Sequence, residues 1–201
     1  MVGIRESGEL RMKIGVLALQ GAFREHIEML ETCGVQAVPI RKPEELDSIE
    51  GLIIPGGEST TIGKLMTEWG LMEKIKNRAA HKMAIYGTCA GMILMAKTIG
   101  GSFQPRLGIM DITVRRNAFG RQQESFEADM TVPELGREPF KGVFIRAPYI
   151  EEAGANVKSM VTVEDKIVMA RQEHLLVTAF HPELTGDNRV HKYFISMMET
   201  L

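Results

Sequence analysis

The chain carries the stretch Ile85-Tyr86-Gly87-Thr88-Cys89-Ala90-Gly91, a G-x-C-x-G sequence between an apolar run and a helical pattern. A nucleophile on a very tight turn from strand to helix adopts strained dihedral angles, and glycines two residues before and after it relieve the clashes. Such a turn lifts the sulfur of Cys89 out of the sheet and places it at the positive end of the helix, which favours the thiolate. The N–H of Ala90 is then expected to face the oxyanion that forms after attack. A buried structural cysteine is the alternative, but sites in open α/β sheets lie at the carboxyl ends of strands, which favours a nucleophile.

Strand-like and helix-like segments alternate along the first hundred residues. Continuous apolar runs, as in strands buried on both faces, are found at residues 13–19, 35–40, 51–55 and 83–86. Helical patterns follow them at residues 23–33, 60–66, 71–80 and 90–99. Because this alternation is typical of a parallel sheet with helices on both faces, we expect an α/β fold, a three-layer sandwich around a central, mostly parallel sheet.

The second half of the chain is richer in strands. Strand-like segments joined by short turns lie at residues 112–116, 126–132, 143–147, 161–163, 167–171 and 175–179, and a last amphipathic helix is expected at about residues 188–200. No repeat or linker separates these segments, so we expect one domain at residues 12–201. Residues 1–11 do not read as a signal peptide and are interpreted as an N-terminal extension before Met12.

Composition narrows the possible functions. With 201 residues, 44% of them hydrophobic, the chain fits one globular domain with a sizeable core. Its formal net charge of -2, with acids and bases interspersed, gives no electrostatic footprint for nucleic acid or a membrane. Cys33 and Cys89 lack metal-ligand spacing, and we expect a protein of the reducing cytoplasm without disulfides.

A cysteine nucleophile needs a base that also returns a proton to the leaving group. His181 ends the apolar run 175–180, again at the carboxyl end of a strand, and Pro182 forces the chain to turn there. Glu183 can then reach the far ring nitrogen of His181, fix its tautomer and stabilise the imidazolium. Alone, His-Pro-Glu is more typical of an ordinary loop. Paired with Cys89 it predicts a triad, and the other four histidines are expected to be solvated or packed.

The glycine loop of residues 55–61 (PGGESTT) follows another predicted strand. It lacks the lysine of a phosphate-binding P-loop, although two glycines permit close approach of the backbone to a ligand. A cysteine nucleophile requires a second N–H for its oxyanion, and Gly57 is the candidate. A simple tight turn is the alternative.

Three motifs together resemble the triad-type (class I) glutamine amidotransferases: residues 55–57, residues 87–91 and His181-Pro182-Glu183. Within that family the chain is most similar to the glutaminase subunits of pyridoxal 5′-phosphate synthase. The stretches that carry this resemblance are residues 15–26 (GVLALQGAFREH), 56–61 (GGESTT), 116–122 (RNAFGRQ), 125–128 (SFEA) and 143–148 (VFIRAP). Ala118 departs from the pattern, where serine is expected. The similarity covers residues 12–201 and implies the flavodoxin-like fold of the family.

The resemblance also implies a reaction and its residues. Cys89 would attack the side-chain amide of glutamine, His181 would shuttle protons, and Glu183 would orient His181. A fixed guanidinium such as Arg116 suits the α-carboxylate of free glutamine. Without the resemblance, a surface ion pair would be the simpler interpretation of Arg116, and the same holds for Arg146. The glutamine-binding positions of the family match Gly57, Glu58, Ser59, Arg116, Ile145 and Arg146.

A partner is implied as well. In this family ammonia passes to a separate (β/α)₈-barrel synthase subunit of a hetero-oligomer, which combines it with a pentose phosphate and a triose phosphate to make pyridoxal 5′-phosphate. Glutaminases of this type depend on that subunit, and a flip of the Gly56–Gly57 peptide on docking is one hypothesis for the dependence. We expect no metal and no bound cofactor, since no lysine is placed by motif to hold pyridoxal phosphate.

Three alternatives stay open. The first is the same chemistry with another acceptor, as in histidine or purine synthesis, and residues 15–26 and 116–122 argue against it. The second is a cysteine α/β-hydrolase acting on esters or lactones. Its chain order is nucleophile, acid, histidine, whereas the order here is Cys89, His181, Glu183. The third is a non-catalytic binding module, which the intact set of these three residues disfavours.

Overall fold

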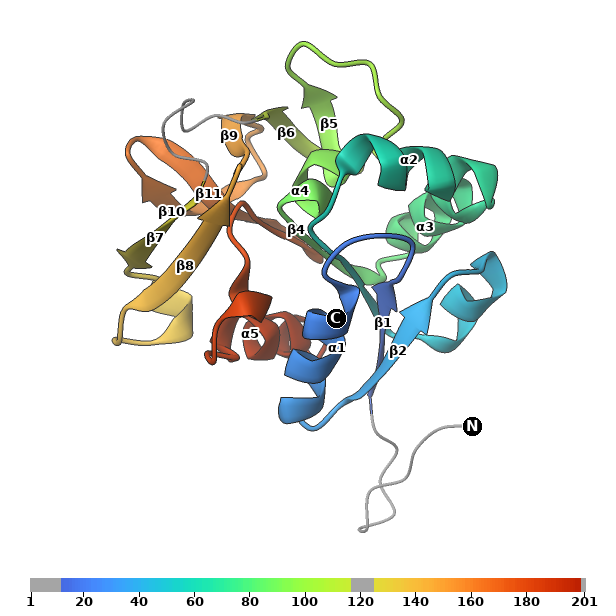
Figure 1. Ribbon diagram of the computed structural model, residues 1–201, viewed down its shortest axis with the longest axis horizontal. Helices are drawn as coiled ribbons and strands as arrows, with labels where there is room; N and C mark the ends of the chain where they lie inside the picture. The colour runs from blue at the N-terminus through green and yellow to red at the C-terminus, as the bar shows by residue number, and fades with distance from the viewer. Residues whose placement is uncertain (1–11, 117–124, 200–201) are drawn as a thin grey trace.

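The computed structural model describes residues 12–116 and 125–199, and a large mixed sheet flanked by helices organises them (Figure 1). Half of this sheet is parallel, with strand order β2-β1-β3-β4-β12. These strands are almost wholly apolar and lie between two layers of helices, as expected of parallel strands. Their bounds are Lys13–Leu17 (β1), Gln36–Ile40 (β2), Gly51–Ile54 (β3), Ala84–Thr88 (β4) and Leu175–Thr178 (β12).

Beyond β12 the sheet becomes largely antiparallel. It continues in the order β11-β9-β6-β5, with β10 paired to β11, and only β5 and β6 run parallel to each other. A separate two-stranded ribbon is formed by β7 and β8. The bounds are Ala96–Ile99 (β5), Met110–Arg115 (β6), Ser125–Met130 (β7), Phe140–Ile145 (β8), Tyr149–Ala153 (β9), Lys158–Val163 (β10) and Lys166–Gln172 (β11).

Helices cover both faces of the parallel half. On one face α1 (Phe23–Thr32) and α5 (Arg189–Met198) lie side by side, and the other face carries α2 (Ser59–Glu68), α3 (Leu71–Ala80) and α4 (Ala90–Met95) (Figure 1). Within the described residues, three short 3₁₀ turns complete the elements, η1 (Pro43–Ser48), η2 (Pro133–Leu135) and η3 (Pro182–Leu184). The predicted α/β fold and its helix-covered parallel sheet are therefore confirmed.

One prediction of local structure was wrong, and one strand was missed. The helix expected over residues 90–99 ends at Met95, and Ala96 turns to extended dihedral angles to begin β5. The N–H of Leu107 caps this end by donating to the Leu94 carbonyl, and β5 gains a parallel partner in β6. Strand β9 was not predicted, because its acidic sequence YIEEA lacks an apolar run. Residues 1–11, which are interpreted as an N-terminal extension, lie outside the described residues. So do residues 117–122 of the 116–122 motif.

The carboxyl ends of β1, β3, β4 and β12 meet at one edge of the sheet. Four segments leave this edge: the loop with Gln20 after β1, the glycine loop after β3, the turn at Cys89 after β4 and the turn at His181 after β12. The described residues include no helix that is both long and apolar enough to cross a membrane. The fold thus brings segments far apart in sequence to a common site.

Candidate active site

Cys89 lies on a strained turn between β4 and α4. Its φ of 48° and ψ of -99° are unusual for a residue with a side chain, as predicted for this position. The flanking glycines permit the turn, because a Cβ atom on Gly91 would lie 2.1 Å from the Ile54 carbonyl oxygen and one on Gly87 would lie 2.6 Å from the Gly91 carbonyl carbon. The thiol is buried, and its Sγ is 4.0 Å from the carbonyl oxygen of Ile145.

His181 and Glu183 form a buried hydrogen-bonded pair. The Nδ1–H of His181 donates to Oε1 of Glu183 over 2.7 Å, with Pro182 opening the turn that folds the carboxylate back. Burial acts to lower the pKa of His181, but its interactions with Cys89 and Glu183 outweigh burial and raise that pKa to about 10. Burial acts to raise the pKa of Glu183, yet its interactions with His26 and His181 lower it overall. This arrangement favours a carboxylate beside an imidazolium.

The glycine loop passes directly over these residues. A Cβ atom on Gly56 would lie 2.4 Å from Cε1 of His181 and 3.5 Å from Cβ of Cys89. The Gly56 carbonyl accepts the N–H of Ala22 at 3.0 Å, so this peptide is tied to the loop after β1. Ala90 is the first residue of α4, and N–H groups of a first helical turn have no partner within their helix.

Polar side chains gather at the start of α2. Glu58 caps this helix by accepting the N–H groups of Thr60 and Thr61 at 3.0 and 2.7 Å. The hydroxyl hydrogen bond from Thr61, helped by the two N–H bonds, lowers the pKa of Glu58 to about 2. A guanidinium N–H of Arg116 donates to Gln104 Oε1 at 2.9 Å, and another of its nitrogens lies 3.7 Å from Glu58. One acid and one base therefore share the rim of the site.

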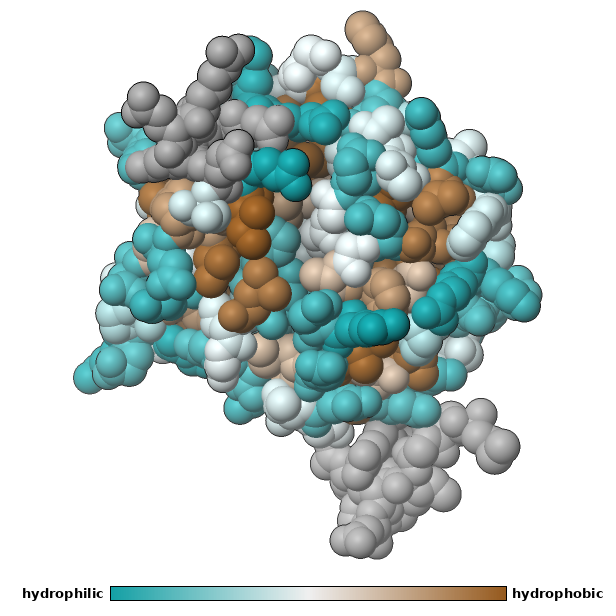
Figure 2. Space-filling model, in the orientation of Figure 1, coloured by the Kyte–Doolittle hydropathy of each residue, from teal (hydrophilic) through white to brown (hydrophobic). Residues whose placement is uncertain are grey.

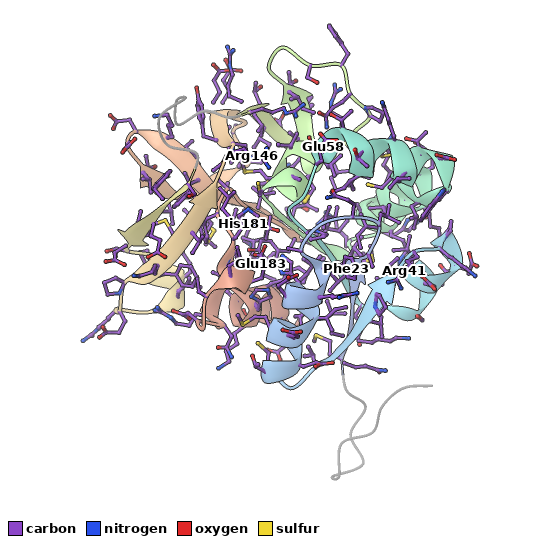
Figure 3. All side chains as sticks on the ribbon, viewed as in Figure 1. Phe23, Arg41, Glu58, Arg146, His181 and Glu183 are labelled. Atoms are coloured by element: carbon purple, nitrogen blue, oxygen red, sulfur yellow. The ribbon has the colours of Figure 1, made fainter. Side chains whose placement is uncertain are left out.

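A cavity of about 400 Å³ joins these groups, a size that suits a small molecule. Glu58 and Arg146 lie above His181 and Glu183 in Figure 3, and the face seen in Figure 2 interleaves polar and apolar side chains. Two predicted residues do not line the cavity: Glu183 lies behind His181, and Ala90 is buried. The predicted residues that line it are Gly57, Glu58, Ser59, Cys89, Arg116, Ile145, Arg146 and His181.

Sequence reasoning missed several lining residues. Gln20 is one of them, and its Oε1 accepts the N–H of Glu58 at 2.7 Å. A usable signal existed, because Gln20 and Gly21 follow the first predicted strand and sites lie at such strand ends. The single apolar residues Ile93 and Leu184 carried no signal. The residues missed are Gln20, Gly21, Ala22, Gly56, Ile93 and Leu184.

Comparisons of the whole chain with known proteins point to one family. A model of the SNO glutamine amidotransferase family matches residues 16–200. The chain is 61% identical over 184 residues to the pyridoxal 5′-phosphate synthase subunit PdxT of Pelotomaculum thermopropionicum, covering 92% of this chain and 94% of that one. It is also 61% identical over 187 residues to the PdxT subunit of Moorella thermoacetica, covering 93% and 100% of the two chains.

Solved structures show the same architecture. A crystal structure described as a glutamine amidotransferase superposes with a TM-score of 0.89 at 49% identity, over 92% of this chain and 98% of that one. The structure of PurLQS from Thermotoga maritima has a TM-score of 0.66 at 16% identity, over 93% of this chain and 99% of that one. At that identity the second likeness concerns the fold alone.

Proposed function

The chain belongs to the SNO glutamine amidotransferase family, and from this premise we propose that it is the glutaminase subunit of a pyridoxal 5′-phosphate synthase. It hydrolyses L-glutamine to L-glutamate and ammonia, and the ammonia is used by a synthase subunit for the biosynthesis of pyridoxal 5′-phosphate. The observation that carries the proposal is the convergence of Cys89, His181 and Gly57 on one cavity, with Glu183 bonded to the far side of the imidazole.

The roles of the site residues follow from their chemistry. The Cys89 thiolate attacks the side-chain amide carbon, and the N–H groups of Gly57 and Ala90 stabilise the oxyanion. The imidazolium of His181 gives its proton to the amide nitrogen, the C–N bond breaks, and ammonia leaves a thioester on Cys89. His181 then takes a proton from water, which attacks the thioester and releases glutamate. Glu183 holds the ring of His181 in place through both steps.

The rim of the cavity is suited to the two charged ends of glutamine. Glu58 stays ionised because its pKa is about 2, so it can receive the α-ammonium. Arg116 and Arg146 offer guanidinium groups for the α-carboxylate, and bidentate pairing of this kind fixes orientation. Ser59 and Ile145 line the same cavity.

The partner is a synthase subunit, and we infer a (β/α)₈ barrel for it from the family resemblance alone. Ammonia is a small, diffusible product, so its transfer requires the two subunits to associate. A hetero-oligomer follows from this requirement. The N–H of Ala22 is hydrogen-bonded to the Gly56 carbonyl. A synthase subunit that docks on the loop after β1 would therefore act on the glycine loop through this bond.

Glutamate release tests the proposal directly. The purified chain is assayed with glutamine, alone and with its synthase subunit, as wild type, Cys89→Ala and Cys33→Ala. Cys33 is the matched control, since it is the other cysteine and ends α1 away from the cavity. We expect hydrolysis that rises with the synthase subunit, disappears in Cys89→Ala and persists in Cys33→Ala. Activity that survives in Cys89→Ala would sink the proposal.

A further inference from the structure

Two buried histidines that no step above uses lie behind Glu183. His26 of α1 and His191 of α5 are both 0% exposed. The His26 Nδ1 lies 2.8 Å from the His191 Nε2, so one imidazole–imidazole hydrogen bond joins the two helices. On its other side, the His26 Nε2 lies 3.1 Å from Thr88 Oγ1 and 3.4 Å from Glu183 Oε2. The His26 ring therefore connects the last helix to the carboxylate that binds His181.

The second oxygen of Glu183 needs a donor. Oε1 is bonded to His181 at 2.7 Å, whereas Oε2 is buried and makes no hydrogen bond of ordinary geometry within the described residues. The His26 Nε2 is the ring nitrogen in ion-pair range of Oε2. A buried carboxylate oxygen left without a donor is costly, and a carboxylate held at one oxygen only can rotate. A proton on the His26 Nε2, shared between Thr88 and Glu183, meets this need.

The pair of rings decides where that proton lies. If the His26 Nδ1 carried the hydrogen, its Nε2 lone pair would face the Glu183 carboxylate. The proton of neutral His191 would then sit on Nδ1, which is buried and has no partner within the described part of the chain. With the hydrogen on the His191 Nε2 instead, the His26 Nδ1 accepts it and the His26 Nε2–H faces Glu183. An unpaired acceptor is tolerated more readily than an unpaired buried N–H, which favours this second arrangement.

We propose that His26 is a positioning residue for the glutaminase reaction: its Nε2–H holds the second carboxylate oxygen of Glu183, and His191 fixes the tautomer that makes this possible. The inference rests on the proposed roles of Cys89, His181 and Glu183. With His26 and His191 added, a series of polar contacts runs from His181 at the cavity through Glu183 to α5. Because α1 leads out of the loop that contacts Gly56, His26 also ties the carboxylate to the element next to the glycine loop.

The charges around His26 agree with a neutral ring. Burial lowers the pKa of His26, and the nearby charges of Glu183 and Glu25 oppose this only in part, while that of His181 adds to it. Burial lowers the pKa of His191 well below its usual value. Tyr86 packs edge-on against both rings and its hydroxyl is turned to Thr178.

The first experiment observes the proton itself. Two-bond ¹H–¹⁵N correlation spectra of the full chain, labelled with ¹⁵N-histidine, distinguish protonation at Nδ1 from protonation at Nε2. Spectra of His26→Gln and His191→Gln assign the two rings. We expect both rings to be neutral and protonated on Nε2 at pH 7.5. A His26 ring protonated on Nδ1 would overturn the proposal whatever the kinetics show.

The second experiment measures catalysis in the assembled enzyme. Glutamate release with the synthase subunit is compared for His26→Leu, which removes the donor, and His26→Gln, whose amide N–H can reach the Nε2 position. We expect kcat to fall by about 10- to 100-fold in His26→Leu with KM unchanged, because a charge-assisted hydrogen bond is lost. Most of this loss should be recovered in His26→Gln. The matched control is His174→Leu, a buried histidine bonded to the carbonyl of Ala79 in α3.

A third readout separates positioning from packing. In a Cys33→Ala background, the rate of alkylation by iodoacetamide against pH reports thiolate at Cys89 in the free chain. A loosened Glu183 stabilises the His181 imidazolium less, so the inflection should move to higher pH in His26→Leu and stay in place in His174→Leu. A folded His26→Leu chain with wild-type kcat would refute the inference. So would a loss of kcat in both His26 variants with an unmoved inflection. Failure of the proposed function would appear instead as an active Cys89→Ala.

Discussion

Gly56 and the imidazole of His181 are so close that no side chain fits between them: a Cβ atom on Gly56 would lie 2.4 Å from Cε1 of His181. The glycine loop thereby sets one wall of the space in which the imidazole meets Cys89. This contact depends on two segments far apart in sequence, the loop after β3 and the turn after β12. It also yields the most direct test of the site.

Gly56→Ala should lower activity strongly while leaving the fold intact. The new methyl group must displace the His181 ring, and a misplacement of about 1 Å at a catalytic group can cost about 100-fold in rate. We expect a loss of kcat of that order, measured as glutamate release with the synthase subunit, and a melting temperature near that of the wild type. Gly186→Ala is the matched control, since a Cβ there meets nothing within 4 Å. Equal rates in the two variants would contradict the proposed place of His181.

Gly91→Ala should act on stability as well. A Cβ atom at Gly91 would lie 2.1 Å from the Ile54 carbonyl oxygen, a backbone atom that cannot move without shifting β3. Overpacking of this kind costs about 1–3 kcal/mol of the free energy of unfolding, and we expect a urea midpoint lowered accordingly. An unchanged midpoint would show that α4 can move away from β3 at little cost.

Much of this site could be predicted from sequence because its chemistry is local. The glycines around Cys89 and the Pro182 turn each encode a backbone geometry within a few residues, and both appear in the structure. The parallel half of the sheet was equally accessible, because strands buried on two faces are continuous apolar runs.

What sequence could not provide depends on contacts between distant segments. Strand β5 follows α4 without a break, and only its pairing with β6 makes the end of the apolar stretch a strand. His26 reads as one polar residue on an amphipathic helix, and its hydrogen-bond partner His191 is 165 residues away. Gln20 is held at the cavity by its hydrogen bond with the N–H of Glu58, which is 38 residues further along the chain.

Glu58→Gln should weaken glutamine binding more than turnover. The amide oxygen can still cap α2, but the negative charge facing the α-ammonium is lost. A charge-assisted hydrogen bond is worth about 1.5–3 kcal/mol, so we expect KM to rise by about 10- to 100-fold with a smaller change in kcat. Glu68→Gln, at the exposed end of the same helix, is the control and should behave as wild type. A fall in kcat at constant KM would instead place Glu58 in the chemical step.

Stability should be greatest near pH 6.5 and fall on both sides, for reasons that involve different histidines. Burial lowers the pKa of His26 and of His191 in the folded chain. As the pH drops below about 6.5, the histidines of the unfolded chain therefore bind protons that the same histidines do not bind in the folded chain. The free energy of unfolding falls as a result. The lowered pKa of Glu183 acts in the same direction, since its contribution is lost as the pH falls through its folded value.

The alkaline side depends on His181, whose folded pKa is about 10. Its contribution is complete below about 6.5, where both states are protonated, and is lost as the pH rises toward 10, because only the folded chain still holds the proton. Urea unfolding at constant ionic strength should therefore show a free energy of unfolding that declines from pH 7 to pH 9.5. In His181→Gln this decline should flatten. The loss of stability at low pH, which depends on His26 and His191, should persist. An equal alkaline slope in both proteins would mean that the imidazolium of His181 is not what Glu183 stabilises.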